Sequence, residues 1–279
     1  MPSHVERFLN DFHNARPGAT SKAFGALPVV FRSRQYASSY EVLAAAVPHV
    51  ERPVEVLDLA CGDGFLLSCL AARSQANLRL TGADMNSSEL EIARARLGSA
   101  ASFHQARAQE LPFAPRSFDY VLCHLALMLM DDVEQVLREI RRVLRPGAQF
   151  AAIVFVSHRP TIACGAYIDA LSKYPRLSQF ADIPQFGDRR IRDRDGILQI
   201  LAPTFRDISI DDIDVVMRLT PDELWLVFLD TYDFYLLDEA KRISFQREYL
   251  CLVGPHCGSD GKLEYALTLR YVDAVATEQ

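Results

Sequence analysis

Two carboxylates and two glycines stand at spacings that could bind a small molecule. Asp58 lies inside an apolar run, Val56-Leu57-Asp58-Leu59, that leads into the small loop Ala60-Cys61-Gly62-Asp63-Gly64. Glycines there let the backbone turn sharply and approach a ligand without an intervening Cβ. A second acid, Asp84, ends the next apolar run about 20 residues later, where an acid accepts hydrogen bonds from a nucleoside ribose. The pattern predicts a nucleoside site.

The same residues narrow the ligand class. A dinucleotide fingerprint requires G-x-G-x-x-G, but Leu67 stands where its third glycine would be. The Asp58 carboxylate would repel a pyrophosphate and suits a ligand that carries an ammonium and a sulfonium group. The glycines alone would also fit an ordinary tight turn between a strand and a helix. Asp84, at the expected distance, makes that alternative the weaker one.

Alternating strand-like and helix-like segments must position these residues. Apolar runs at 54–59, 78–83, 101–106, 117–123 and 148–156 predict strands, and helices are expected between them. Ser88 and Glu91 form a capping-box pattern that opens a helix closed by Gly98. Residues 133–144 show one apolar face at helical spacing and stop at Pro146-Gly147. The chain is therefore predicted to be an α/β protein with a parallel sheet, whose carboxyl edge binds ligands.

The glycine loop resembles motif I of the class I S-adenosylmethionine (SAM) methyltransferases, with Ala60 in place of the first glycine. Leu144-Arg145-Pro146-Gly147 and Leu111-Pro112-Phe113 are similar to further segments of that family. The resemblance implies a Rossmann-like fold with a mostly parallel seven-stranded sheet and an antiparallel last strand at 263–275. It also implies an N-terminal helical lid at 1–50 and a SAM-binding domain at 51–279. A substrate-side insertion is expected around 159–204 and helices around 221–253.

The resemblance also assigns site residues. Cofactor contacts are implied for Asp58, Ala60, Cys61, Gly62, Gly64, Asp84, Met85, Ala108, Gln109, His124 and Tyr36, with Tyr40 as a second lid residue. Arg107 departs from the family, since it occupies the place of an acid beside the adenine. A guanidinium group cannot accept a hydrogen bond. Gln109, Glu110 or backbone groups at Ala108 are the alternatives for that role.

Methyl transfer from a sulfonium needs mainly alignment of the nucleophile, the carbon and the sulfur. A general base is needed only if the acceptor loses a proton, and histidine is the usual base. His13, His124 and His158 are the candidates, and a structural role is the alternative for each. No residue pattern indicates a metal site.

The flanking segments are less informative. Val5, Phe8, Leu9 and Phe12 predict a short amphipathic helix, broken at Pro17-Gly18, and a second helix is expected at 34–47. Thr220-Pro221 opens a helix expected to carry Trp225, Phe228, Tyr232 and Tyr235 on one face. Such a row could line a pocket for a planar acceptor or simply form core.

Composition limits the function classes. The chain has 279 residues, 49% of them hydrophobic, and a net charge of -6, which argues against a general nucleic-acid binder. Six cysteines without a C-x-x-C pair indicate reduced thiols, and no signal peptide or membrane span is predicted, so a cytoplasmic location is expected. We predict a SAM-dependent methyltransferase acting on an oxygen or nitrogen of a small molecule, with S-adenosylhomocysteine (SAH) as product. The alternatives are a non-methylating enzyme such as a cyclase, a protein or RNA methyltransferase, and a non-enzymatic SAM-binding protein. The sequence leaves the oligomeric state open.

Overall fold

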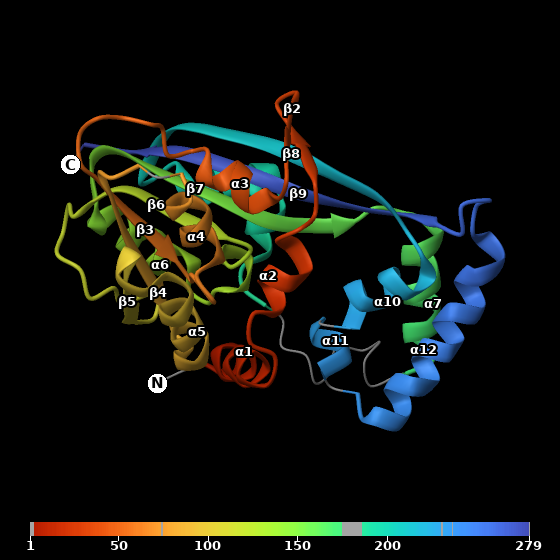
Figure 1. Ribbon diagram of the computed structural model, residues 1–279. Coiled ribbons are helices and arrows are strands. Elements are labelled where there is room, and N and C mark those ends of the chain that lie inside the picture. The colour runs from red at the N-terminus through yellow and green to blue at the C-terminus, as the bar shows by residue number, and fades with distance from the viewer. Residues whose placement is uncertain (1–2, 74, 175–185, 230, 236, 279) are drawn as a thin grey trace. The chain divides into compact units, whose positions relative to one another are not determined.

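The structure is a computed structural model that describes residues 3–278 except 74, 175–185, 230 and 236 (Figure 1). Its described α-helices are α1 (His4–Ala15), α2 (Ala19–Phe24), α3 (Ser39–Ala44), α4 (Phe65–Ala71), α5 (Ser87–Leu97), α6 (Val133–Val143), α7 (Ile162–Ser172), α9 (Arg194–Leu201), α10 (Pro221–Leu229), α11 (Tyr232–Tyr235) and α12 (Glu239–Val253). Its described strands are β1 (Val29–Phe31), β2 (Arg34–Tyr36), β3 (Val54–Leu59), β4 (Leu78–Asp84), β5 (Ala101–Gln105), β6 (Phe118–His124), β7 (Leu144–His158), β8 (Phe205–Leu219) and β9 (Leu263–Ala276).

Seven strands form one sheet in the order β5-β4-β3-β6-β7-β9-β8. The pairs β3/β4, β4/β5, β3/β6 and β6/β7 are parallel. β9 is antiparallel to β7. The side chain of Gln149, early in β7, bonds to Asp273 late in β9, and the N–H of Arg159, just after β7, bonds to the carbonyl of Ala266 early in β9. The predicted mostly parallel sheet with an antiparallel last strand is confirmed.

The sheet interior explains why these segments form strands. All residues of β3 except Glu55 are buried, and the five residues 150–154 of β7 are buried as a continuous apolar run. Strands covered on both faces read as such runs instead of alternating. α4 contacts β4, α5 contacts β4 and β5, and α3 contacts β6. The buried sheet holds the carboxyl ends of β3, β4 and β6 at fixed positions, and these ends carry the predicted site residues.

The chain divides into two compact units. The first contains Met1–Val156, Phe186–Ile213 and Leu269–Gln279, and the second contains Ser157–Gln185 and Asp214–Thr268. Residues 1–50, expected as a lid, are part of the first unit. The segment 186–204 of the expected insertion also belongs to the first unit, whereas its start at 159 and the helices at 221–253 belong to the second.

The N-terminal region contains one helix that the sequence predicts and a hairpin that it does not. α1 begins with a capping box between Ser3 and Glu6, and its apolar face is buried as expected. The helix expected at 34–47 is wrong at its start, because 34–36 form β2, which pairs with β1. The turn between them has positive φ at Arg32 (47°) and Ser33 (63°), residues that do not signal such a turn. Asp211 accepts from the Arg32 guanidinium at 2.5 Å and stabilises this conformation.

Two further helix predictions are corrected. The N-cap of α5 is Asn86, whose side chain accepts from the Glu89 N–H, so the capping box predicted at Ser88 is wrong by two residues. The aromatic face expected on one helix is divided, because α10 ends at Leu229 and Tyr232 and Tyr235 lie on the separate α11.

The aromatic residues of the second unit pack against one another. Trp225, Phe228, Phe234 and Phe245 are buried, and the Tyr167 ring stacks on Phe228 with centroids 4.1 Å apart. Within the second unit these side chains therefore form a core. In the described part of the chain, no helix combines the length and the apolar character needed to cross a bilayer.

Candidate ligand site

The loop after β3 turns on three residues with positive φ: Ala60 (57°), Gly62 (49°) and Gly64 (75°). The Cys61 N–H donates to the Ala83 carbonyl at 3.1 Å, and the Gly64 N–H donates to the Cys61 carbonyl at 2.9 Å. The loop is thus held against the end of β4. We call Asp58, residues 60–64 and Asp84 the ligand cradle.

Glycine is needed in the cradle for different reasons at different positions. A Cβ on Gly64 would lie 2.9 Å from Leu97 Cδ1 and 3.0 Å from Ala93 Cβ, so Gly64 allows α5 to pack closely. In β4, a Cβ on Gly82 would lie 2.7 Å from Cys61 Sγ. A Cβ on Gly62, in contrast, would meet no protein atom nearer than Glu89 Oε2 at 4.0 Å. The space over Gly62 is therefore open to a ligand.

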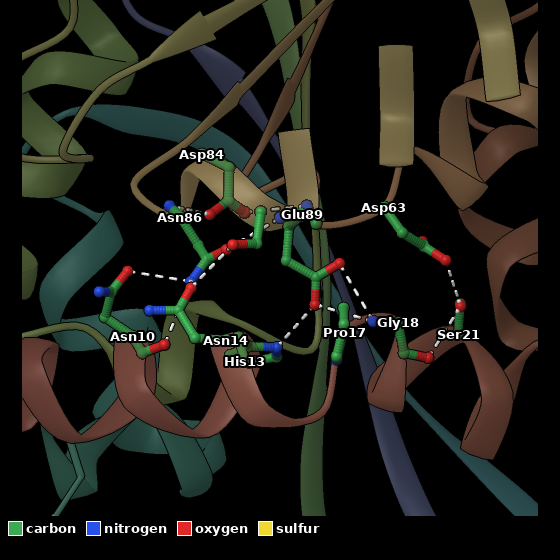
Figure 2. A network of polar contacts seen from close by, with 12 residues as sticks. Asn10, His13, Asn14, Pro17, Gly18, Ser21, Asp63, Asp84, Asn86 and Glu89 are labelled. Atoms are coloured by element: carbon green, nitrogen blue, oxygen red, sulfur yellow. Dashed lines mark hydrogen bonds and ion pairs between the residues drawn. The ribbon is translucent and has the colours of Figure 1, made fainter. Parts of the chain in front are cut away.

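Asp84 is fixed by two backbone groups. Its Oδ2 accepts from the Gly62 N–H and its Oδ1 from the Asn86 N–H, both at 2.8 Å (Figure 2). Burial raises the pKa of this carboxyl, and the two N–H donors oppose that effect. Each carboxylate oxygen keeps a further lone pair, so Asp84 can accept from two hydroxyls of a ligand.

Asp58 is the least solvated acid of the cradle. It is 1% exposed, and its Oδ2 is buried and has no hydrogen-bond partner in the described part of the chain. Burial raises its pKa well above the ordinary range, and the negative charges of Asp84 and Asp63 add to the shift. An unpaired buried carboxylate is costly unless a donor or a cation compensates it. Asp58 is therefore suited to receive a cationic ligand group.

Strand register brings Asp58, Asp84 and His124 to one face of the sheet. Asp58 is in register with Gly82 on β4 and Leu122 on β6, and registered residues of parallel neighbours point to the same side. Asp84 and His124 lie two residues further along those strands and share that side. The chain adds β4 and β5 on one side of β3 and then crosses to β6 on the other. Such a switch point is where open α/β sheets bind ligands.

The charges around the cradle favour a cation. Four acids gather there: Asp58, Asp63, Asp84 and Glu89. Arg96 pairs with Asp63 at 2.7 Å and His13 with Glu89 at 2.9 Å, but no ion pair among the described residues includes Asp58 or Asp84. The described residues contain no cluster of histidine, cysteine and acidic side chains arranged for a metal ion. The carboxylates of Asp58 and Asp84 therefore favour a ligand group that carries positive charge.

His124, at the end of β6, is buried and neutral. Its Nε2 lies 2.9 Å from Ser39 Oγ, and its ring stacks on Tyr40 with centroids 3.6 Å apart. Burial lowers its pKa to about 3, and its buried Nδ1 has no hydrogen-bond partner among the described residues. A group with this pKa is a poor proton acceptor at neutral pH. The unpartnered Nδ1 can form a hydrogen bond with a ligand.

The two tyrosines expected at the cofactor lie in different places. Tyr36 is on β2, where the Arg34 guanidinium lies 5.0 Å from the ring centroid. Tyr40 is on α3, between His124 and the Phe65 ring at the start of α4. Burial raises the pKa of Tyr40 well above its ordinary range, and the negative charges of Asp63 and Asp58 add to the shift. Of the two, the structure brings Tyr40 to the cradle.

The loop after β5 is tied to its surroundings by side-chain contacts. Arg107 donates from Nε to Glu6 Oε1 of α1 at 2.9 Å, so the unexpected base is paired with an acid from a distant segment. Gln109 donates to the Asp131 carbonyl at 2.8 Å, and Met85 accepts at its carbonyl from Gln105 at 3.0 Å. Ala108 lies between Arg107 and Gln109 in this loop. The loop follows β5, whose neighbour β4 ends in Asp84.

The other two histidines are engaged by neighbours. His13 Nδ1 lies 2.9 Å from Glu89 Oε1, and because a carboxylate only accepts, this nitrogen carries the proton. His158 is exposed in the second unit, with Nδ1 3.2 Å from Tyr265 Oη.

Sequence reasoning missed the residues that join α1 to the cradle. Asn86 and Glu89, on the first turn of α5, bond to Asn10, Asn14, His13 and Gly18 (Figure 2). The pattern Asn86-x-x-Glu89 is itself an N-cap signal and could have been read as such.

The fold and the cradle define an α/β protein with an acid-lined site, open over Gly62, at the switch point of its sheet. Residues 57–152 match the family model "Methyltransferase domain". Over this segment the chain is similar to the class I SAM-dependent methyltransferases, as the resemblance implied.

Relatives are similar over part of their length. The methyltransferase GfsG of Streptomyces halstedii is 32% identical over 52% of this chain and 56% of its own length. The O-methyltransferase resE of Aspergillus sclerotiorum is 30% identical over 53% of this chain and 62% of its own. The ubiquinone/menaquinone biosynthesis C-methyltransferase UbiE of Hahella chejuensis is 35% identical over 42% and 49%. The matches thus span between 49% and 62% of these relatives.

Solved structures share the fold. Phosphoethanolamine N-methyltransferase 2 of Haemonchus contortus, solved with SAH, has a TM-score of 0.59 at 16% identity over 100% of this chain and 61% of that one. The [4+2]-cyclase SpnF has a TM-score of 0.58 at 17% identity over 100% and 98%. At such identities the likeness concerns the fold alone.

Proposed function

We propose that the cradle binds SAM and that the protein transfers its methyl group to an oxygen or nitrogen of a small molecule. The carrying observations are the buried Oδ2 of Asp58, which has no hydrogen-bond partner among the described residues, and the open space over Gly62, four residues further along the chain. An ammonium or sulfonium group placed there would compensate the buried charge. Asp84, with free lone pairs beyond its two N–H donors, would accept from the ribose hydroxyls.

Bound SAM would supply a methyl group already activated by its sulfonium. The residues of this chain have to bind, orient and exclude water. Asp58 and Asp84 lie two strand positions apart in register and would hold two ends of the ligand. His124 would contribute a hydrogen bond from its buried Nδ1, with its ring fixed by Ser39 and Tyr40. Met85, Ala108 and Gln109 are proposed to contact the adenine side.

The histidines favour an acceptor atom that can be methylated with little help from a general base. His124, with a pKa of about 3, does not accept a proton at neutral pH, and His13 is bound to Glu89. An amine or an easily ionised hydroxyl needs the least help from a base. His158 stays a candidate base in the second unit. Relatives named as O- and C-methyltransferases support a small-molecule acceptor but do not agree on its atom.

The test is transfer of label from methyl-labelled SAM. The purified protein is incubated with small-molecule extract, with total RNA and with protein separately, and the fractions are counted. The Asp84→Ala variant serves as a matched control with an impaired ligand site. We expect label in a small product, dependent on wild-type Asp84.

Three results would contradict the proposal. Label in protein or RNA would assign a macromolecular acceptor. SAM binding without transfer, together with conversion of an unlabelled metabolite, would indicate a non-methylating enzyme of the kind represented by the cyclase SpnF. Absence of SAM binding would remove the basis of the assignment.

A further inference from the structure

Ser39 and His124 form a buried pair of side chains at the ligand site. Ser39 is the first residue of α3 and is 1% exposed, and His124 is the last residue of β6 and is 6% exposed. The serine Oγ lies 2.9 Å from His124 Nε2, and neither side chain makes a second hydrogen bond within the described part of the chain. The stacked Tyr40 ring holds the plane of the imidazole. The positions of the protons in this pair therefore follow from its donors and acceptors.

His124 is neutral, so one ring nitrogen carries a proton and the other carries a lone pair. Burial lowers its pKa to about 3. Its hydrogen-bond partner is a neutral hydroxyl, which does not offset the cost of a buried imidazolium as a carboxylate would. Which of the two nitrogens carries the proton decides what His124 can bind.

Two arrangements of the protons are possible. With the proton on Nε2, the ring donates to Ser39 Oγ, and both the serine hydrogen and the Nδ1 lone pair lack a partner among the described residues. With the proton on Nδ1, the serine hydroxyl donates to the Nε2 lone pair, and the Nδ1 N–H is the one group left without a partner. Each buried polar group that stays unpaired costs stability. The arrangement with the proton on Nδ1 leaves one such group instead of two and is favoured.

A proton on Nδ1 makes His124 a hydrogen-bond donor. Its partner must carry a lone pair, which excludes the ammonium and sulfonium groups proposed to meet Asp58. A negatively charged oxygen forms the strongest bond of this kind. A reacting amine would lose its single lone pair to this donor, whereas an oxygen keeps another lone pair for attack. The donor therefore suits an anionic oxygen.

We infer that Ser39 is a positioning residue that holds the proton of His124 on Nδ1, and that this N–H selects an anionic oxygen of a bound molecule. The identity of the bound molecule rests on the proposed function. The oxygen belongs either to the carboxylate in the amino-acid part of SAM or to an ionised hydroxyl of the methyl acceptor. The same hydrogen bond would serve both, and experiment separates them.

The role of Ser39 is tested on the ligand-free protein by nitrogen NMR with isotope-labelled histidine, in which protonated and bare ring nitrogens give separate signals. His124→Phe identifies the His124 signals by their absence. In wild type we expect a protonated Nδ1 and a bare Nε2 from about pH 5 to about pH 8, the range in which an ordinary histidine loses its charge. Ser39→Ala leaves both arrangements with equal numbers of unpaired groups, so we expect a mixture of the two.

Two further variants serve as controls. Ser39→Thr keeps the hydroxyl and should retain the proton on Nδ1. Ser38→Ala changes the adjacent serine, which is 2% exposed and makes no capping hydrogen bond, and it should leave the His124 signals as in wild type.

The oxygen is located by adding ligands to the labelled protein. A shift of the Nδ1 signal with SAH alone assigns the oxygen to the carboxylate of the nucleoside. A shift that needs para-nitrophenolate together with SAH assigns it to the methyl acceptor. His124→Phe keeps a ring beside Tyr40 but has no donor, and it should weaken the ligand that causes the shift by about 10–150-fold, the worth of a hydrogen bond to a charged group. Ser39→Ala, with about half of its molecules in the donor form, should weaken that ligand by about twofold.

Three results would overturn the inference while the proposed function stands. A proton on Nε2 in wild type, or an Nδ1 proton that Ser39→Ala leaves unchanged, would refute the role of Ser39. An Nδ1 signal that neither ligand shifts, although SAH is bound, would refute the selection of an oxygen. If SAH does not bind, the proposed function and the selection of an oxygen both fall, and the ligand-free spectra decide the role of Ser39 separately.

Discussion

Gly62 and Gly64 allow a matched test of the cradle. Both have positive φ, 49° and 75°, so alanine at either position suffers a similar backbone penalty of about 1–2 kcal/mol. A loss of unfolded-state entropy of about 0.4–1 kcal/mol offsets part of it. The Cβ at 64 would also press on Leu97 and Ala93 at 2.9 and 3.0 Å, which adds about 1–3 kcal/mol for overpacking. Among the described residues, the nearest atom to the Cβ at 62 beyond its chain neighbours is Glu89 Oε2, at the 4.0 Å limit of ordinary contact.

Gly62→Ala should therefore reduce the stability of the ligand-free protein by about 1 kcal/mol, and Gly64→Ala by about 2–4 kcal/mol. For SAH binding the order of the two effects reverses, and Gly62→Ala is the more damaging substitution. The methyl group at 62 would project into ligand space, so SAH affinity should fall about tenfold or more relative to wild type.

Denaturation of the ligand-free variants and calorimetry with SAH measure the two effects separately. Equal destabilisation by both substitutions would refute the packing argument. Undiminished SAH affinity in a folded Gly62→Ala protein would refute the placement of the ligand.

Three other predictions concern the remaining cradle residues. Asp84→Ala should weaken SAM by about 1–3 kcal/mol, the cost of losing hydrogen bonds to a charged acceptor, and unchanged binding in calorimetry would remove Asp84 from the ribose. Because burial raises the pKa of Asp58, the unfolded chain ionises first, and ligand-free stability should fall as pH rises above the ordinary value of 3.8. Asp58→Asn should abolish this part of the pH dependence, stabilise the ligand-free protein at neutral pH and weaken the binding of SAM. If thermal melts show that the variant is less stable than wild type, the buried-charge argument is contradicted. Ala60→Gly should relieve a φ of 57° and change stability by about 0 to +1 kcal/mol, and clear destabilisation in urea unfolding would count against that strain.

The sequence predicted those parts of the site that depend on short stretches of neighbouring residues. The strand before Gly62, the acid at Asp84 and the helix between them follow from apolar runs, glycines and spacing. The mostly parallel seven-stranded sheet with an antiparallel last strand then follows from the resemblance, and the structure confirms it.

Contacts between distant segments could not be predicted. Glu6 and Arg107 are separated by 101 positions, and Glu89 and His13 by 76, so no local pattern indicates that either pair meets. The two-residue β1–β2 turn requires positive φ at Arg32 and Ser33, residue types that do not signal such a turn, and the Arg32 side chain pairs with Asp211 far along the chain. Tertiary contacts override local preference in these cases.

Calorimetric titration of the wild-type protein with SAH, followed by competition with a nicotinamide dinucleotide, tests the central claim most directly. The account predicts one SAH site per chain, with SAH bound more weakly by Asp58→Asn and Gly62→Ala and not displaced by the dinucleotide. Absence of SAH binding, or displacement of SAH by the nicotinamide dinucleotide, would contradict it.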